Sequence, residues 1–304
     1  MPQPKFYKGN IMAEQLDRQC IKVLTAVVMV AIGTATIFFP SQGHAAGIWT
    51  NEPTGASVVL DCPFNSVSGC GILDAYATSQ VVPDASAPVS PSNVVKSTLL
   101  PGNTGGGIQL NYVTPQVQRE MYMGLMWRTN PQFQGRVVGN KMFFLRGPGA
   151  NGVWLFGNSA LVGGTAPMIF AHNTGGLDNS HVCALDSGLA CYPNVGDGTL
   201  RVGTWTKLEA YVKASTTMTS RDGIVRWWIN GVLVGNYTNL NYAQNGLNEW
   251  VWAETWDGLV NPPPTVEWNH FLDHLHVSIP NGGGTTDQPP GPPASPSIRG
   301  VTVP

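Results

Sequence analysis

Charged residues are scarce in this chain of 304 residues: Asp, Glu, Lys and Arg together make up 11% of it. An average soluble domain has roughly 25%. Coiled coils and disordered acidic chains need far more charge, so the composition excludes both classes. The formal net charge is −2, which provides no positive field for a polyanion, and we expect no nucleic-acid partner.

The chain also lacks a clean helical hydrophobic period in any long window beyond its N-terminal leader. Instead, short apolar runs are separated by Gly, Pro, Asn and Thr, and the chain contains 36 Gly and 24 Pro. This punctuation is typical of an all-β protein. The 10 Trp, 8 Tyr and 10 Phe suffice for a large core, with aromatic side chains left over for a binding surface.

The N-terminal segment carries the pattern of an export signal. Basic residues precede an apolar run over 23–39, and the small residues Gly43 and Ala45 stand three and one positions before a cut at Ala46. We therefore expect residues 1–45 to be a signal peptide, leaving a secreted or periplasmic protein free of the membrane. The alternative is a retained anchor, although a run of about 17 residues is short for a bilayer.

Four cysteines follow the leader as two local pairs, Cys62 with Cys70 and Cys183 with Cys191. An even number of cysteines in an exported chain predicts disulfides, and of the three possible connectivities we choose these two local bridges. A metal site is the alternative, but the chain has no CxxC spacing and no His near the first pair.

The rest of the chain divides into one domain over 46–280 and a Gly/Pro-rich linker or tail over 281–304. Residues 47–100 are predicted to be irregular, apart from a short strand at 57–60. Dense strands are predicted near 107–113, 119–128, 137–146, 152–157, 166–171, 205–213, 224–230, 232–238, 249–256 and 266–278. We see no internal repeat and expect a monomer.

Alternation along these strands predicts which side chains share a face. Within 207–213, the residues Leu208, Ala210 and Val212 are expected to face the core. On the opposite face of this strand, aromatic and charged side chains are mixed, and the same mixture occurs on one face of each of two other predicted strands. The three sets are Lys207, Glu209, Tyr211 and Lys213 in the first strand, Arg226, Trp228 and Asn230 in the second, and Trp250, Trp252, Glu254 and Trp256 in the third.

A solvent-facing sheet surface with such a mixture suits a sugar polymer. Aromatic rings stack on the C–H faces of pyranoses, and Arg or Lys bind uronic or sulfated sugars. We therefore predict that Arg146, Lys141, Trp228, Trp252, Glu254, Trp256 and Glu209 bind substrate. The alternative is that several of these Trp residues belong to the core, because Trp is mostly buried on average.

Two segments resemble a known superfamily. The pattern G-x-W-x-x-L-E over 203–209 is followed by D-G-x-x-x-x-W-x-N-G-x-L-V over 222–234. These segments resemble the central hairpins of concanavalin A-like lectin/glucanase jelly rolls, especially secreted polysaccharide lyases and laminin-G-like modules. Residues 271–278 resemble the closing strand of that fold. The resemblance implies a two-sheet antiparallel β-sandwich, a jelly roll that hosts lectins, hydrolases and lyases alike.

A glycoside hydrolase of this fold is disfavoured by the sequence. The family-16 signature E-x-D-x-x-E is absent, and its nearest echo, Glu254-Thr255-Trp256-Asp257, puts its two carboxylates on opposite strand faces. A retaining hydrolase needs two carboxyl groups about 5–5.5 Å apart. Glu254 therefore needs a partner from another strand, such as Glu209.

The lyase interpretation requires a group that neutralises the uronate carboxylate, a base for the C5 proton and an acid for the leaving oxygen. We assign Arg128 and Arg226 to neutralisation, His172 as the base and Tyr211 as the acid. The alternatives are a locally satisfied strand-end histidine, a rim tyrosine and solvated arginines.

A metal could also bind near the last strand. His270, His274 and His276 would share one face of an extended strand, so a zinc site is possible. The resemblance favours a structural calcium instead, with Asp273 and Glu52 as oxygen ligands, and no cofactor is required for the reaction. The sequence thus predicts an exported polysaccharide-acting protein, most simply a lyase on acidic glycans. The alternatives are a non-catalytic carbohydrate-binding module, a jelly-roll hydrolase and an interaction protein without a glycan ligand.

Overall fold

The chain divides into two units, Met1–Gln42 and Gly43–Pro304. The computed structural model describes residues of the second unit: 47–90, 92–103, 108–133, 140–148, 152–158, 168–174, 190–191, 193–217, 219–241, 245–253 and 264–280, with the backbone alone for 140, 152–158, 168–174 and 190–191. The predicted signal peptide and the tail over 281–304 lie outside these residues, so their boundaries stay predictions.

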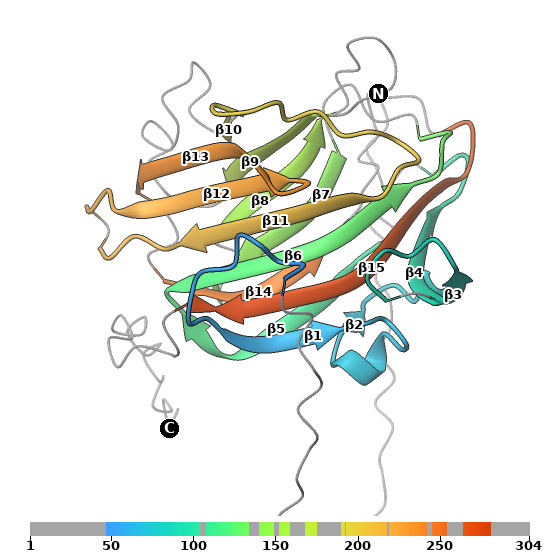
Figure 1. Cartoon of the computed structure of the whole chain (residues 1–304), viewed down its shortest axis with the longest axis horizontal. Coiled ribbons are helices and arrows are strands. Elements are labelled where there is room, and N and C mark those ends of the chain that lie inside the picture. Colours follow the sequence, from blue (N-terminus) through green and yellow to red (C-terminus); the bar gives the residue numbers. More distant parts are fainter. Residues whose placement is uncertain are drawn as a thin grey trace, which may run out of the picture. The chain divides into compact units, whose positions relative to one another are not determined.

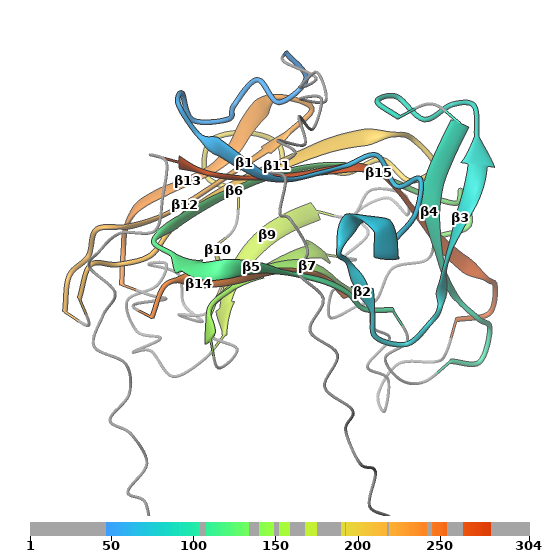
Figure 2. The same ribbon diagram turned by 90° about the horizontal axis from the view of Figure 1, so that it is seen from below.

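The described residues form two antiparallel sheets that lie one above the other (Figures 1 and 2). Sheet A has the order β13-β12-β11-β6-β15-β4-β3, and β1 also pairs with β15. Its strands are β13 (Val232–Leu240), β12 (Gly223–Ile229), β11 (Thr206–Lys213), β6 (Glu120–Thr129), β15 (Trp268–Ile279), β4 (Ser92–Leu99), β3 (Ser79–Asp84) and β1 (Ser57–Cys62).

Sheet B has the order β10-β9-β8-β7-β14-β5-β2. Its strands are β10 (Ala190–Cys191), β9 (Met168–Thr174), β8 (Gly152–Asn158), β7 (Asn140–Arg146), β14 (Leu247–Trp252), β5 (Leu110–Gln118) and β2 (Leu73–Asp74). The two sheets make the predicted two-layer antiparallel β-sandwich. In the described part of the chain the one helix is a 3-10 turn, η1 (Ser68–Cys70), and no helix there is long and apolar enough to cross a bilayer.

The core lies between the sheets and is built from alternate residues of each strand. On β11, Leu208, Ala210 and Val212 are buried in it, as the alternation predicted. Five tryptophans are almost fully buried: Trp127, Trp227, Trp250, Trp252 and Trp268. Burial of five large rings makes this layer the main source of hydrophobic stabilisation.

Strand β14 places its tryptophans on the opposite face from the one predicted. Trp250 and Trp252 are each 0% exposed and belong to the core, so the assignment of Trp252 to substrate binding is wrong. The physical reason is that a two-residue period gives two faces without saying which one is dry. Glu254 and Trp256 lie outside the described residues, so their assigned roles stay predictions.

Residues 47–100 are more ordered than the composition suggested. They contain β3 and β4, which pair from Ser79–Ser97 to Asp84–Ser92 at one edge of sheet A. The edge position explains why Pro83 is tolerated in β3, because an edge strand has one side without ladder hydrogen bonds. The described residues 85–90 of the Pro/Ser-rich stretch follow β3 as a loop.

The three histidines of the last strand do not share a face. His270 is fully buried in the core, where desolvation lowers its pKa to about 3 and Trp127 donates its indole N–H to Nδ1 over 3.1 Å. A register shift between Asp273 and His276 then marks a β-bulge, and His274 has a left-handed φ of 52°. The extra residue changes the alternation, so His274 and His276 contact groups on the outer side of sheet A.

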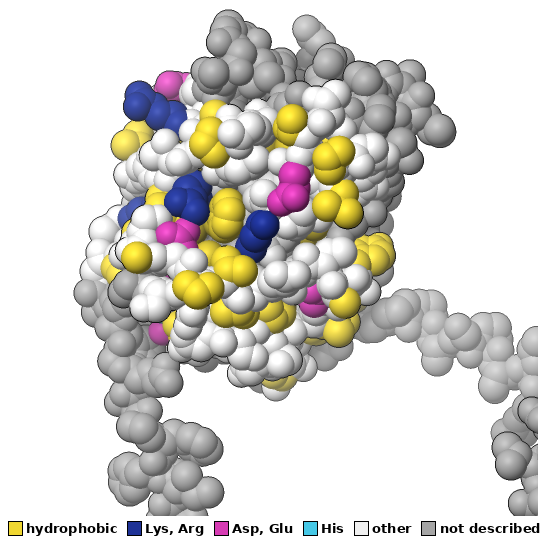
Figure 3. All heavy atoms as spheres, turned by 90° about the vertical axis from the view of Figure 1, so that its right-hand side faces the viewer, with side chains coloured by type: hydrophobic (Ala, Val, Ile, Leu, Met, Phe, Trp, Pro, Cys, Tyr) yellow, Lys and Arg dark blue, Asp and Glu magenta, His cyan; other side chains and the backbone are white. Residues whose placement is uncertain are grey.

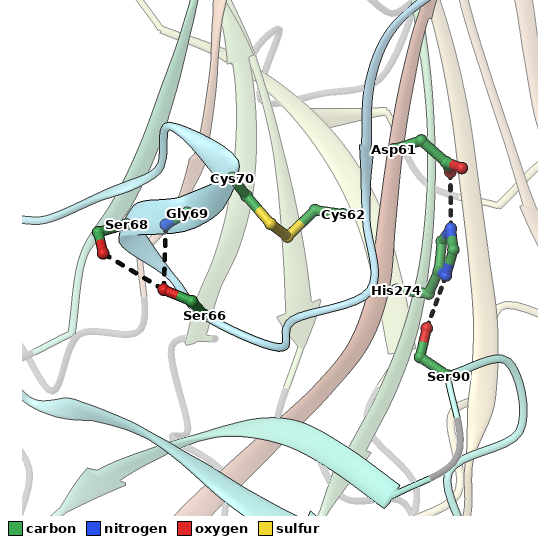
Figure 4. The surroundings of a disulfide bond; sticks show 8 residues. All are labelled: Asp61, Cys62, Ser66, Ser68, Gly69, Cys70, Ser90 and His274. Atoms are coloured by element: carbon green, nitrogen blue, oxygen red, sulfur yellow. Dashed lines mark hydrogen bonds and ion pairs between the residues drawn. A yellow bond between two sulfur atoms is a disulfide. The ribbon is translucent and has the colours of Figure 1, made fainter. Parts of the chain in front are cut away.

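Two local predictions are confirmed. Asn230 and Gly231 form the two-residue turn between β12 and β13 with positive φ values of 51° and 81°, which their residue types tolerate. Cys62 and Cys70 form a disulfide that ties β1 to η1 (Figure 4). The second bridge stays a prediction, because Cys183 lies outside the described residues and only the backbone of Cys191 is described.

Candidate functional site

The sequence-predicted site residues separate onto opposite sides of the sandwich. Arg128, Glu209, Tyr211, Arg226 and Trp228 belong to strands of sheet A and point away from the core. Arg146, Lys141 and His172 belong to β7 and β9 of sheet B. The four predicted catalytic residues therefore cannot meet at one substrate, because the buried core separates His172 from the other three. Long-range pairing, which alternation along single strands does not reveal, decides this outcome.

The centre of the outer face of sheet A is covered by residues 47–52, which we call the strap. Figure 2 shows this segment, in blue, on the outer side of the sheet. The Trp49 ring lies directly on Gly124 of β6, where an added Cβ would come within 2.3 Å of the indole. Trp49 also stacks on His276 with ring centroids 5.8 Å apart. Gly124 thus provides the space that lets the strap pack against the sheet.

Buried Glu209 is the polar anchor of the strap. Its side chain is fully buried and accepts hydrogen bonds from the Tyr122 hydroxyl at 2.6 Å and from Asn51 through both the backbone N–H and the side-chain amide. The Lys207 ammonium lies 3.1 Å from Glu209 and also donates to the Ile48 carbonyl at 2.7 Å. These contacts hold the carboxylate in a structural network rather than on a free binding surface.

The other predicted residues of sheet A also have internal partners. The Tyr211 hydroxyl donates to Glu120 at 2.6 Å, and burial together with this hydrogen bond raises the pKa of Tyr211. Arg226 donates to the Asn236 side chain at 2.9 Å. The indole of Trp228 packs, partly buried, beside the cluster of Trp49, Tyr122, Met126 and Tyr211.

Arg128 also has partners within the protein. Its guanidinium pairs with Asp84 at 2.6 Å and lies over the rings of Trp205 and Phe271, 4.8 and 4.6 Å from their centroids. On the side of the molecule that includes β3 and β4, basic and acidic side chains are interspersed with hydrophobic ones (Figure 3). This part of sheet A therefore presents paired charges rather than a cationic field.

The outer face of sheet B carries a different polar group. Arg146 donates to Glu249 of β14 from Nε at 2.6 Å and from a terminal nitrogen at 3.1 Å. Asn111 of β5 donates to the same carboxylate at 2.6 Å. The Arg146 and Glu249 side chains are 25% and 15% exposed, so the group is partly open to solvent. A bidentate pair fixes the plane of the guanidinium while leaving further N–H donors for a ligand.

Apolar residues lie beside this group in cross-strand register. Phe144, Val251 and Ala253 form a small cluster separate from the main core. Residues that pair directly from strand to strand form a row across the sheet. One such row crosses five strands and consists of Asn111, Val251, Phe144, Trp154 and His172. The neighbouring row joins Val113, Glu249, Arg146, Gly152 and Thr174. His172 thus stands at a backbone position one row from Arg146 and two strands away.

Sequence reasoning missed Glu249 and Asn111. A signal was present for Glu249, because it alternates with Trp250 and Trp252 and so must face away from them. Nothing in the sequence showed that Asn111 pairs opposite Val251 and reaches the same carboxylate, since that contact spans 138 positions.

The contacts of the predicted calcium ligands do not fit a calcium site. Both oxygens of Asp273 accept backbone N–H groups, from Val89 at 2.8 Å and from Ser90 at 3.1 Å. Glu52 lies 2.9 Å from the His276 ring. Calcium prefers six to eight oxygen ligands, and the described residues contain no group of three or more His, Cys, Asp or Glu that could hold a metal ion. Calcium stays a prediction that these contacts do not favour.

Comparison with known proteins supports the fold alone. No protein-family model matches the chain, and no curated protein matches it in sequence. Among solved structures, a PL-14 alginate lyase from Aplysia kurodai is 14% identical with a TM-score of 0.52, covering 74% of this chain and 100% of that one. The alginate lyase vAL-1 from Chlorella virus is 12% identical with a TM-score of 0.51, covering 73% and 100%.

The third structure is an endo-β-1,4-glucuronan lyase from the fungus Trichoderma reesei, 13% identical with a TM-score of 0.50, covering 72% of this chain and 94% of that one. At this identity the likeness establishes a shared fold, and the predicted two-sheet antiparallel jelly roll is confirmed.

Proposed function

We propose that the protein is an exported polysaccharide lyase that cleaves uronate-containing glycans on the outer face of sheet B. The observation that carries this proposal is the partly exposed Arg146, one register row from His172. Its guanidinium is held by Glu249, whose carboxylate also accepts a hydrogen bond from Asn111. The shared fold of alginate and glucuronan lyases is consistent with it, because both polymers consist of uronates.

β-Elimination gives each of these residues a distinct task. Arg146 binds the uronate carboxylate and so acidifies the adjacent C–H. His172 takes that proton, the bond to the leaving oxygen breaks, and an unsaturated sugar forms. The proton returns to the leaving oxygen from the imidazolium or from water, a step for which Tyr211 is excluded by its place on sheet A.

The separation of Arg146 and His172 suits this division of tasks. Two strand spacings and one i to i+2 step put their Cα positions roughly 12 Å apart. An arginine and a histidine side chain can approach one sugar ring from opposite sides over such a distance. Glu249 acts through Arg146, because it fixes the orientation of the guanidinium.

The test is ultraviolet detection of unsaturated product with a panel of uronate polymers. We expect turnover by the wild type and losses of about 10²-fold or more in Arg146→Ala and His172→Ala. Arg201→Ala, at an exposed position outside the strands, serves as the matched control and should retain activity. Absence of product from every uronate polymer, with a folded wild type, would contradict the proposal.

A non-catalytic carbohydrate-binding module is the second candidate. Two exposed apolar residues favour it: Leu73, 64% exposed and opposite Asn111, and Val113, 55% exposed and opposite Glu249. Both extend the register rows of sheet B with surface on which sugar C–H groups can pack. Binding of a glycan without any unsaturated product would establish this function. A hydrolase is disfavoured, because it needs two carboxyl groups that face each other across the scissile bond. The partner of Glu249 in this group is instead the Arg146 guanidinium.

The proposal extends to location and assembly. The disulfide between Cys62 and Cys70 fits an oxidising compartment, and we propose that the chain is exported and acts as a monomer. Fractionation and light scattering of the mature protein test both points.

A further inference from the structure

We propose that Ser90, His274 and Asp61 form a second, hydrolytic site in which Ser90 attacks a carboxylic ester. The three residues come from separate segments: the loop between β3 and β4, the bulge of β15, and β1. Figure 4 shows them in one line near the Cys62–Cys70 disulfide. The site lies on sheet A and does not rest on the function proposed for sheet B.

The geometry is that of an activated hydroxyl. The Ser90 Oγ lies 2.7 Å from Nδ1 of His274, and Nε2 of the same ring lies 2.6 Å from Asp61 Oδ1. With the proton on Nε2, the ring donates to Asp61 and accepts the Ser90 proton, which is the division of roles in a Ser-His-Asp triad. The two ring nitrogens are exchanged relative to the serine proteases, but either nitrogen can act as the base.

The backbone around the histidine is specialised for this position. His274 has a φ of 52° at the β-bulge of β15, a strained conformation for a residue with a Cβ. Strained residues of this kind concentrate at functional sites. The adjacent Asp273 accepts the backbone N–H groups of Val89 and Ser90. The same bulge therefore places the base and anchors the loop that carries the nucleophile.

A second histidine keeps the carboxylate charged. His276 lies 3.2 Å from Asp61 through Nδ1 and 2.9 Å from Glu52 through Nε2. Hydrogen bonds from His274 and then His276 hold the pKa of Asp61 well below its usual range. An ionised Asp61 fixes the His274 tautomer and stabilises the imidazolium that forms during attack, so Asp61 is a positioning residue.

Access and electrostatics limit the substrate to esters. His274 is 7% exposed, whereas Ser90 is partly exposed, so the substrate reaches the hydroxyl from the solvent side. The N–H groups of Val89 and Ser90 are occupied by Asp273 and cannot serve as an oxyanion hole. Such a site can cleave an ester with a good leaving group but lacks the stabilisation that an amide requires.

The reaction is balanced without a further reactant except water. Ser90 Oγ bonds to the acyl carbon as its proton moves to Nδ1 of His274. The leaving alcohol then takes that proton, and an acyl-Ser90 ester remains. Water attacks this ester with the same histidine as base, releasing a carboxylic acid and restoring Ser90.

The test uses the full mature chain with p-nitrophenyl acetate and, separately, a fluorophosphonate probe. We expect the probe to modify Ser90, as located by mass spectrometry, and Ser90→Ala to reduce hydrolysis about 10²-fold or more. Ser92→Ala changes an exposed serine two positions along and should leave the rate unchanged. Labelling elsewhere, or hydrolysis equal in wild type and Ser90→Ala, would overturn the proposal, and the labelling result on the wild type does not depend on any variant folding.

The role of Asp61 has its own measurement. Asp61→Asn keeps the shape of the side chain but removes the charge that fixes the His274 tautomer. Labelling of Ser90 by the probe should therefore slow about tenfold or more. Asp61→Glu restores a carboxylate and should recover part of the rate. If Asp61→Asn and Asp61→Glu are both labelled as fast as the wild type, Asp61 has only a structural role.

Discussion

The two outer faces of the sandwich carry similar kinds of side chain but use them in opposite ways. On sheet A, Glu209 is fully buried under the strap among Tyr122, Lys207 and Asn51. Tyr211, Arg226 and Arg128 have partners on other strands of the same sheet. On sheet B, Arg146 and Glu249 remain partly exposed, and Leu73 and Val113 lie open to solvent. The same composition thus serves packing on one face and a candidate glycan surface on the other.

An aromatic and charged strand face is therefore not sufficient to indicate a ligand site. Whether another part of the chain covers that face decides the outcome. Here a segment of six residues next to the predicted cleavage site covers the centre of sheet A. The register of sheet B brings Arg146 and Asn111 to one carboxylate, that of Glu249. Substitutions under the strap on sheet A should therefore affect stability, and substitutions around Arg146 on sheet B should affect turnover of a uronate polymer.

The largest expected effect concerns Lys207. Lys207→Met leaves the buried Glu209 carboxylate without its cation, which should lower the free energy of unfolding by about 3 kcal/mol. Urea denaturation measures this loss. The double variant Lys207→Met with Glu209→Gln, which removes both charges, should recover part of the stability. Equal stability of wild type and Lys207→Met would show that the strap network is solvated.

The next effect separates the two faces by activity. Arg146→Lys keeps a positive charge but loses the bidentate geometry, so turnover of a uronate polymer should fall about tenfold or more while the melting temperature changes little. Tyr211→Phe lies on the opposite face and should leave turnover unchanged. Loss of turnover in Tyr211→Phe with retained activity in Arg146→Lys would reverse the assignment of the active face.

A smaller effect is expected at the contact between the strap and sheet A. Gly124→Val pushes methyl groups into the Trp49 ring and should destabilise the fold by about 1–3 kcal/mol. Gly124→Val combined with Trp49→Ala should be less destabilised than the sum of the two changes, because the clash is then absent. Additive losses would place Trp49 away from Gly124.

The smallest effect is a dependence of stability on pH. Burial opposes protonation of His276, but hydrogen bonds to Asp61 and Glu52 outweigh it and raise its pKa above the usual 6.5. A raised pKa contributes stability that is complete below 6.5 and is lost as pH rises through the folded value. The lowered pKa of Asp61 contributes stability above 3.8 that is lost as pH falls through the folded value. The network should be strongest between these values.

Thermal melting from roughly pH 3 to pH 9 measures this dependence. We expect His276→Gln to flatten the decline above pH 6.5, because glutamine has no proton to lose. Arg201→Ala, which leaves the network unchanged, should keep the wild-type profile. An unchanged decline in His276→Gln would assign the effect to another group.

Several features followed from the sequence because they depend on neighbouring residues. Alternation identified the core side of β11, the Asn230-Gly231 pair predicted a hairpin turn, and the eight-residue spacing of Cys62 and Cys70 predicted a local disulfide. The candidate site was recovered only in part, since Arg146, Lys141 and His172 were named but grouped with residues of the other sheet. The face of Trp252 was assigned incorrectly, because both faces of β14 mix apolar and polar types.

Spacing over a few residues was enough to predict the class of fold, the main strands beyond residue 100, the turn at Asn230-Gly231 and the disulfide between Cys62 and Cys70. The same kind of pattern did not predict β3 and β4. Three features became evident only once the sheets were packed: Trp252 lies in the core, residues 47–52 cover Glu209, and Asn111 and Arg146 meet at Glu249. Those contacts join strands more than a hundred positions apart, and their register is set by the packing of two whole sheets rather than by any local pattern.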